Sequence, residues 1–140
     1  MILVVCLDEN NGLMFNKRRQ SRDRVLISDL LCTAGEGTVC ISPYSAPLFP
    51  EADRRVRVCN EPHLAAVEGE LCFCEDFDPR LCADRIEGLI IYRWNRLYPS
   101  DVRFELDLSD FRLVDTQSFT GSSHDMITKE ILKNERKEKH

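Results

Sequence analysis

Two short runs of the chain are continuously apolar. Ile2–Leu7 and Gly88–Tyr92 contain no charged residue and are rich in isoleucine, leucine and valine. A strand covered on both faces has this composition, because neither face meets water. We therefore predict that both runs are interior strands of one sheet. Val102–Leu108 alternates strictly between apolar and charged residues, which predicts a strand with one exposed face.

Two longer helices are predicted from spacing and caps. Apolar residues recur at helical spacing from Val25 to Leu31, and Ser21 is the predicted N-cap of this helix. Asp78-Pro79 predicts the start of another helix that runs through Ile86. An aspartate there accepts hydrogen bonds from first-turn amides, and a proline at the first helical position gives up no needed donor.

The remaining predicted elements are short. At the C-terminus, small hydroxyl residues after Gly121 precede an apolar segment, which favours a capped helix over Met126–Leu132; a final strand is the alternative. Residues 134–140 are almost all charged and are expected to fray as a tail. The other expected elements are strands at Thr38–Ile41, Arg55–Val58, Gly69–Cys74 and Phe111–Phe119 and a helix at Pro62–Val67.

Strands that alternate with helices, followed by a late run of strands, predict an α/β fold. We expect a single-domain three-layer sandwich, residues 1–133, with a central mixed and mostly parallel sheet, followed by the charged tail 134–140. No segment reaches the roughly 18 apolar residues that a membrane span needs. The apolar N-terminal run lacks the basic leader of a secretion signal. We therefore predict a soluble, cytoplasmic protein with no membrane partner.

Seven cysteines require a choice between thiols, disulfides and metal. Their number is odd, and several fall in predicted strands, where cysteine acts as a small core residue. Free thiols are therefore the favoured interpretation. A metal site built on Cys72 and Cys74, with Cys59 or His63, is the alternative, but no second closely spaced pair completes a tetrahedral set. We predict no metal.

The charge distribution suggests a local anion site. The net charge of the chain is −5, and acidic residues are spread along it, so general adhesion to duplex DNA is not expected. Asn16–Arg24 is nevertheless strongly basic and leads into a predicted helix N-terminus, where backbone amides also favour anions. A second turn, Gly121–His124, combines a glycine, two hydroxyls and an imidazole. The candidate ligand-binding residues are Asn16, Lys17, Arg18, Arg19, Arg22, Ser122, Ser123 and His124.

Each of these segments also has a purely structural interpretation. The basic segment is equally typical of a solvated loop whose charges pair with nearby carboxylates, and the Gly121 turn of a simple helix cap. Ser123, His124 and Asp125 do not form a nucleophilic relay with one another, because sequence neighbours cannot adopt its geometry. Three histidines are too few for a metal-dependent nuclease.

The first sixteen residues, Met-Ile-Leu-Val-Val-Cys-Leu-Asp-Glu-Asn-Asn-Gly-Leu-Met-Phe-Asn, are similar to the opening of dihydrofolate reductases. In that family the first strand runs into an Asp-x-Asn-x-x-Ile-Gly-x-x-Asn loop. Later elements also resemble the family: the strands at Thr38–Ile41 and Val56–Cys59, and Gly88–Ile91 leading to Tyr98 and Asp101. The resemblance spans most of the chain and implies a dihydrofolate reductase-like fold.

The chain departs from the family at the functional motifs. Lys17–Ser21 stands where the family has Leu-Pro-Trp, and Asp23 and Asp29 are the candidates for the carboxylate that binds the pterin. Ser42–Ser45 replaces the Gly-Arg-x-Thr turn that gathers nucleotide phosphates, and its proline removes an amide donor. Tyr92-Arg93-Trp94 replaces the Gly-Gly pair that admits the cofactor.

We therefore expect a non-catalytic dihydrofolate reductase-like protein with no cofactor. Its expected partner is a phosphorylated small molecule or RNA, bound at the basic segment. Two alternatives remain: an NAD(P)H-dependent reductase acting on a pterin-like substrate, and a protein-interaction module in which the arginines pair with acidic residues of a partner.

Overall fold

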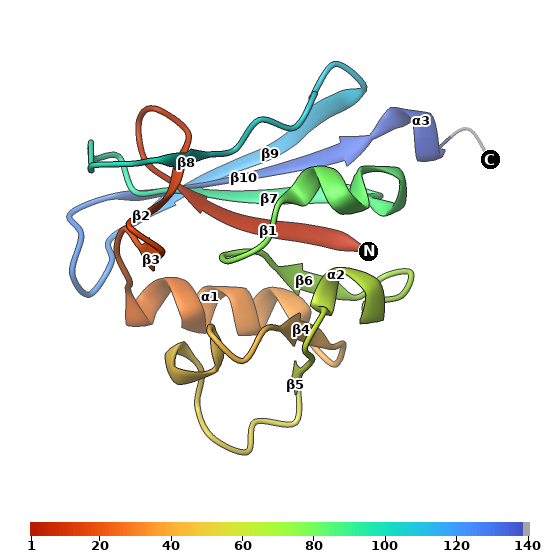
Figure 1. Ribbon diagram of the computed structural model, residues 1–140, viewed down its shortest axis with the longest axis horizontal. Helices are drawn as coiled ribbons and strands as arrows, with labels where there is room; N and C mark the ends of the chain where they lie inside the picture. The colour runs from red at the N-terminus through yellow and green to blue at the C-terminus, as the bar shows by residue number, and fades with distance from the viewer. Residues whose placement is uncertain (139–140) are drawn as a thin grey trace.

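A seven-stranded sheet in the order β5-β4-β6-β1-β7-β10-β9 organises the chain (Figure 1). The computed structural model describes residues 1–138. A second sheet, in the order β3-β2-β8, lies beside the carboxyl end of β1 (Figure 1). The elements, with η for a 3-10 helix, are β1 (Ile2–Leu7), β2 (Gly12–Phe15), β3 (Arg18–Arg19), α1 (Arg24–Ala34), β4 (Val39–Ile41), η1 (Ala46–Leu48), β5 (Val56–Val58), α2 (Pro62–Ala65), β6 (Leu71–Phe73), η2 (Pro79–Arg85), β7 (Gly88–Arg93), β8 (Val102–Arg103), β9 (Phe111–Phe119), β10 (Ile127–Asn134) and α3 (Glu135–Glu138).

Both continuous apolar runs are interior strands, as predicted. β1 lies between β6 and β7, and β7 lies between β1 and β10. The pairings from β5 through β4, β6 and β1 to β7 are all parallel, whereas β10 is antiparallel to both of its neighbours. The sheet is therefore mixed and mostly parallel, and the fold is the predicted α/β sandwich.

The two faces of the sheet bury separate apolar clusters. Side chains alternate along β1, so Val4 packs with Leu26 and Leu30 of α1, while Leu3 and its neighbours at every second position face the opposite side. That opposite side is covered by shorter pieces of chain, contributed by β2, α2, η2 and the segment around Phe104. Complete burial of each such leucine contributes about 1.5–3 kcal/mol. The two faces of the sheet are therefore covered differently, and the one long helix, α1, lies below the sheet in Figure 1.

The C-terminal segment is a strand, so the helix predicted over Met126–Leu132 was wrong. β10 pairs with β7 on one side and β9 on the other, which supplies backbone partners along both edges. Ile127 and Lys129 are buried at alternate positions, a period of two that the helical spacing of Ile127 and Ile131 had concealed. β10 extends to the buried Asn134 and is followed by α3. The last two residues of the predicted tail, 139–140, lie outside the described residues.

Two local predictions also need correction. Asp23, not Ser21, caps α1, because its carboxylate accepts from the amides of Val25 and Leu26. Asp78 caps the predicted helix at Pro79, and this helix is of the 3-10 type. The alternating segment from Val102 contributes only the two residues of β8 to a ladder.

The cysteines lie mostly in the apolar clusters, and Cys40, Cys72, Cys74 and Cys82 are buried. Burial raises the pKa of the Cys40 and Cys82 thiols to about 11 in each case. Among residues 1–138, no three His, Cys, Asp or Glu side chains are grouped in a way that would hold a metal ion. None of the helices in this part of the chain has the length and apolar character to cross a membrane.

Candidate functional site

The basic segment Asn16–Arg24 begins as part of a β-hairpin, whereas the sequence had suggested a loop. β2 pairs with β3 in the register Met14↔Arg19 and Phe15↔Arg18. Asn16 and Lys17 form the turn with φ values of 51° and 61°, the positive-φ pair of a type I′ turn. Neighbouring residues of a strand point to opposite faces. Arg18 is accordingly exposed, while Arg19 turns toward the protein.

Arg19 is held by a two-point ion pair with Glu75, which follows β6. Its Nε and Nη2 donate to the two carboxylate oxygens at 2.9 and 3.2 Å. The guanidinium also lies over the ring of Tyr44, 4.4 Å from the centroid, and donates to the Tyr44 carbonyl. Ser45 Oγ donates to the same carboxylate at 2.7 Å. The Arg19–Glu75 pair and its neighbours Tyr44 and Ser45 lie where the segments that follow β4 and β6 meet the hairpin.

The first turn after β1 is organised by Asp8, which has no exposed surface. Its carboxylate accepts from the amides of Asn10, Gly12 and Tyr98 and from the side chain of Gln20. Burial alone would raise the pKa of Asp8, but these hydrogen bonds outweigh it and lower the pKa. Asp8 therefore fixes the hairpin and the segment after β7 against the end of β1.

Asp23 is the most heavily hydrogen-bonded side chain of the region. Besides capping α1, its carboxylate accepts from the amides of Ser122 and Ser123 at 2.9 and 2.8 Å and faces Nδ1 of His124 at 2.9 Å. Burial alone would raise the pKa of Asp23, but the bonds from His124 and the backbone amides outweigh it and hold the pKa far below its ordinary 3.8. Asp23 therefore remains an anion and ties the β9–β10 turn to α1.

His124 is buried between aromatic and hydroxyl groups. Its ring stacks on Trp94 with a centroid separation of 4.5 Å and an interplanar angle of 24°. Its Nε2 lies 2.9 Å from Ser21 Oγ and 3.1 Å from the hydroxyl of Tyr98. These five residues, Asp23, His124, Ser21, Tyr98 and Trp94, are called the Asp23 cluster below.

The Asp23 cluster changes what the predicted Gly121 turn can offer an anion. The amides of Ser122 and Ser123 already donate to Asp23, and Ser122 Oγ accepts from the amide of Arg24. An internal carboxylate thus occupies the position that an external phosphate would take at this helix N-terminus. Only the side chains of the turn remain for a ligand.

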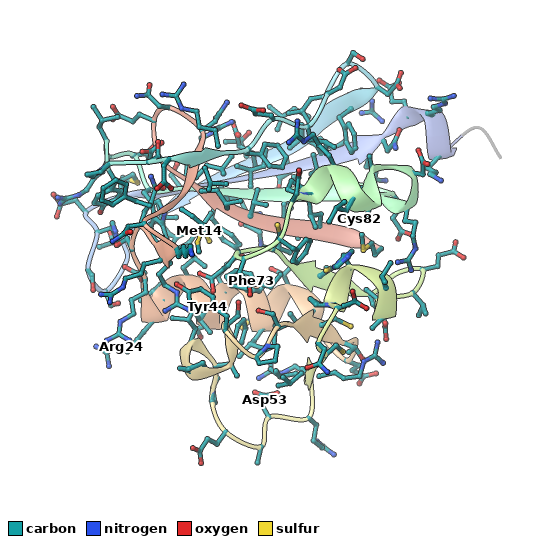
Figure 2. All side chains as sticks on the ribbon, viewed as in Figure 1. Met14, Arg24, Tyr44, Asp53, Phe73 and Cys82 are labelled. Atoms are coloured by element: carbon teal, nitrogen blue, oxygen red, sulfur yellow. The ribbon has the colours of Figure 1, made fainter. Side chains whose placement is uncertain are left out.

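A groove of about 710 Å³ runs along α1 beside this turn. Arg55 lines it but is paired with Asp53 through Nη2 and Oδ2 at 2.8 Å. Arg22 and Arg24 are exposed, and within the described residues neither guanidinium has an ion-pair or hydrogen-bond partner. Arg24 extends outward at the start of α1, and Asp53 lies in the loop between η1 and β5 (Figure 2). The apolar side of this arginine groove is formed by Ile27, Leu31, Pro47, Leu48 and Phe49.

The structure brings together only part of the predicted site. Arg22, Ser122 and Ser123 line the arginine groove. His124 lies behind them in the buried Asp23 cluster. The other predicted residues are placed elsewhere: Asn16, Lys17 and Arg18 at the exposed hairpin, and Arg19 in its ion pair with Glu75.

Sequence reasoning missed Arg24, Asp23 and Ser21 as members of one site. Ser21 and His124 are separated by about a hundred positions, and no spacing within either segment reports their contact. The available signal was the pairing of an aspartate before a helix with a Ser-Ser-His turn. Only the placement of the β9–β10 turn against the start of α1 joins them.

The positions that the resemblance links to cofactor and substrate are occupied by side chains. Tyr92 and Trp94 are buried, with 0% and 3% of their surface exposed. The Tyr92 hydroxyl donates to Asp29 Oδ2 at 2.6 Å, and Lys129 Nζ lies 2.9 Å from the same oxygen. Both candidate pterin carboxylates, Asp23 and Asp29, are therefore engaged within the protein.

Comparison with solved structures supports the fold. The chain is similar to dihydrofolate reductase from Enterococcus faecalis, complexed with NADP(H) and RAB-propyl, with a TM-score of 0.64 and 13% sequence identity over 94% of each chain. No family model matches the sequence. No curated protein matches it either. At this identity the likeness establishes a dihydrofolate reductase-like fold and nothing finer.

Proposed function

We propose that this chain, whose fold is that of dihydrofolate reductases, does not reduce folates and instead binds a phosphate-bearing ligand, a nucleotide or RNA, in the arginine groove. The observation that carries the proposal is the pair Arg22 and Arg24 beside an apolar wall, two guanidiniums that have no partner within residues 1–138. Arginine binds phosphate through planar, charge-assisted hydrogen bonds, and an apolar wall suits a base or another flat group.

Loss of the reductase reaction is supported by what fills the edge where the strands end. In doubly wound sheets, ligands bind outside the carboxyl ends of the strands. Here the Arg19–Glu75 pair and Tyr44 lie beyond β4 and β6, and the Asp23 cluster, which includes Trp94, lies beyond β7. A nicotinamide and a pterin would have to displace buried and half-buried side chains that contact one another.

This proposal predicts that the purified protein neither binds NADPH with micromolar affinity nor oxidises it in the presence of dihydrofolate. Calorimetry measures the binding, and the loss of NADPH absorbance measures turnover. An active dihydrofolate reductase assayed in parallel is the control. Saturable micromolar binding together with turnover would restore the reductase alternative.

Replacing Arg22 and Arg24 together by alanine should weaken binding of ATP or of a single-stranded oligoribonucleotide by about 100-fold or more. A hydrogen bond to a charged group contributes about 1.5–3 kcal/mol, and each arginine supplies at least one. The salt dependence of oligoribonucleotide binding should fall as well. The slope of log affinity against log salt concentration becomes shallower by about 0.7 for each phosphate contact that is lost. Fluorescence anisotropy at two salt concentrations measures both effects.

The matched control removes the same charge elsewhere. Lys17→Ala with Arg18→Ala changes two exposed cations of the hairpin that do not line the groove, and binding should change by less than about threefold, as expected for distant, screened charges. If the hairpin variant loses affinity and the groove variant keeps it, the ligand site lies at the hairpin. No detectable binding by the unmodified protein at millimolar ligand contradicts the proposal and favours the interaction module.

One observation favours that second candidate. β9 is a nine-residue strand at the edge of the described sheet, with β10 as its only neighbour there. Nearly all of its side chains are exposed, including those of Leu113 and Val114. An exposed strand edge is a ready template for pairing with another chain.

A further inference from the structure

Three members of the Asp23 cluster are arranged as a nucleophile, a base and an orienting carboxylate. Ser21 Oγ lies 2.9 Å from Nε2 of His124, and Nδ1 of the same ring lies 2.9 Å from Asp23 Oδ2. Both distances fall within the range that activates a serine hydroxyl in acyl transfer. The relay draws on two distant segments, so it differs from the Ser123-His124-Asp125 arrangement that geometry excludes.

The hydrogen bonds around the ring fix its tautomer. Ionised Asp23 can only accept, so Nδ1 carries the proton and Nε2 is left as the acceptor. Four backbone amides hold the carboxylate, and stacking on Trp94 holds the plane of the imidazole. A base that is buried and oriented on two sides needs little reorganisation before it accepts a proton.

We infer that Ser21 is an activated nucleophile, with His124 as its general base and Asp23 as the positioning residue, and that it accepts the acyl group of a carboxylic ester bearing a nearby anionic group. Ser21 is half-buried, whereas His124 and Asp23 are almost fully buried, so the hydroxyl is the accessible end of the relay. This inference goes beyond the proposed function, since ligand binding in the arginine groove requires no covalent step.

The surroundings of Ser21 indicate the class of ester. The next residue is Arg22, whose side chain lines the arginine groove and would attract an anionic group on the substrate. The backbone N–H of Arg22 makes no hydrogen bond within the described residues. In serine hydrolases of the nucleophile-elbow type, the residue after the nucleophile donates one of the bonds to the developing oxyanion.

The reaction balances without a cofactor. As Ser21 Oγ forms a bond to the carbonyl carbon, its proton passes to Nε2 of His124; the ester C–O bond then breaks, and the leaving alkoxide takes that proton. In the second half, water adds to the acyl carbon while Nε2 takes a proton from it. The Oγ–C bond breaks, and the proton returns to Ser21, which leaves a free carboxylic acid.

Tyr98 competes with Ser21 for the base. Its hydroxyl lies 3.1 Å from Nε2, which has a single lone pair, so only one of the two hydroxyls donates well at a time. Removing the Tyr98 hydroxyl should therefore increase the fraction of molecules in which Ser21 is bonded to the base. A purely structural network would respond to the same change with lower stability and no gain in reactivity.

An alkyl fluorophosphonate tests the inference on the intact chain. Attack by Ser21 Oγ forms an O–P bond and expels fluoride, while the serine proton passes to His124. Intact mass and peptide mapping should locate one adduct on Ser21. It should form at least about 100-fold faster than on any other serine, in line with the contribution of a positioned base.

Three variants complete the test. Ser21→Ala should abolish the adduct, Ser109→Ala, an exposed serine outside the cluster, should leave it unchanged, and Tyr98→Phe should raise the labelling rate about twofold. Absence of a Ser21 adduct on the folded, unmodified protein overturns the inference, as does a labelling rate on Ser21 that is no higher than on the other serines. Because labelling needs no nucleotide, its failure is distinguishable from failure of the groove to bind ATP or RNA.

Discussion

Replacing Asp23 by alanine should lower the free energy of unfolding by about 3–5 kcal/mol, measured by urea denaturation. The change removes the N-cap of α1, which contributes about 0.5–2 kcal/mol. It also leaves the part-buried amides of Ser122 and Ser123 and the buried Nδ1–H of His124 without their acceptor. An unsatisfied buried donor costs about 1–3 kcal/mol, and a part-buried one costs less. Water entering the vacated space offsets part of that sum.

Asp125→Ala is the matched control for this variant. Asp125 is fully exposed and lies 4.0 Å from Arg96, so its loss should leave the free energy of unfolding nearly unchanged. If both variants lost the same free energy of unfolding, the Asp23 hydrogen bonds would contribute no more to stability than an exposed carboxylate does.

The contribution of Asp23 also has a defined pH dependence. Its pKa is lowered on folding from 3.8, so the folded state favours the carboxylate anion. The stabilisation is therefore complete above pH 3.8, declines below it, and is lost as the pH falls through the folded-state pKa. The stability difference between the unmodified protein and Asp23→Ala should be constant near neutrality and should narrow only in acid.

Replacing Arg19 by alanine should destabilise the protein by about 3–5 kcal/mol, because the Glu75 carboxylate would be left in a nearly buried position without its cation. The side chain of Glu75 is only 9% exposed. Changing Glu75 to glutamine in the same chain removes that charge and keeps an acceptor for Ser45. The double variant should therefore recover more than half of the loss, again by urea denaturation.

The exposed pair Arg80–Asp78 serves as the comparison. It has the same two-point geometry, with Nη2 and Oδ2 2.9 Å apart, but its side chains are 61% and 41% exposed. Arg80→Ala should therefore lower the free energy of unfolding much less than Arg19→Ala does, since solvent screens the pair. If Arg19→Ala lowers the free energy of unfolding as little as Arg80→Ala does, the Arg19–Glu75 pair contributes no more to stability than an exposed ion pair.

How far the sequence predicts this molecule depends on the range of the interactions involved. The continuous runs Ile2–Leu7 and Gly88–Tyr92 identified the interior strands, because a strand buried on both faces has an apolar residue at nearly every position. The apolar spacing from Val25 to Leu31 identified α1 for the same reason. The similarity of the first sixteen residues to dihydrofolate reductases pointed to the fold that the structural comparison supports.

Elements defined by their partners were not predictable in this way. β3 has two residues and exists only through its pairing with β2, and β10 is a strand because β7 and β9 flank it. The spacing of its isoleucines fits a helix equally well, so the ladder decided between the two.

The same distinction between local features and long-range contacts applies to the candidate site. The sequence by itself located the basic segment and the Ser-Ser-His turn, since charge and turn chemistry are local properties. Only the tertiary structure decided that Arg19 pairs with Glu75 and that Asp23 accepts hydrogen bonds from the amides of the turn. It also decided that Arg22 and Arg24 lie at a groove without a partner among the described residues. Ion pairs and hydrogen bonds between distant segments depend on distances of a few ångströms. Those distances are fixed only in the folded chain, so they cannot be read from the order of the residues.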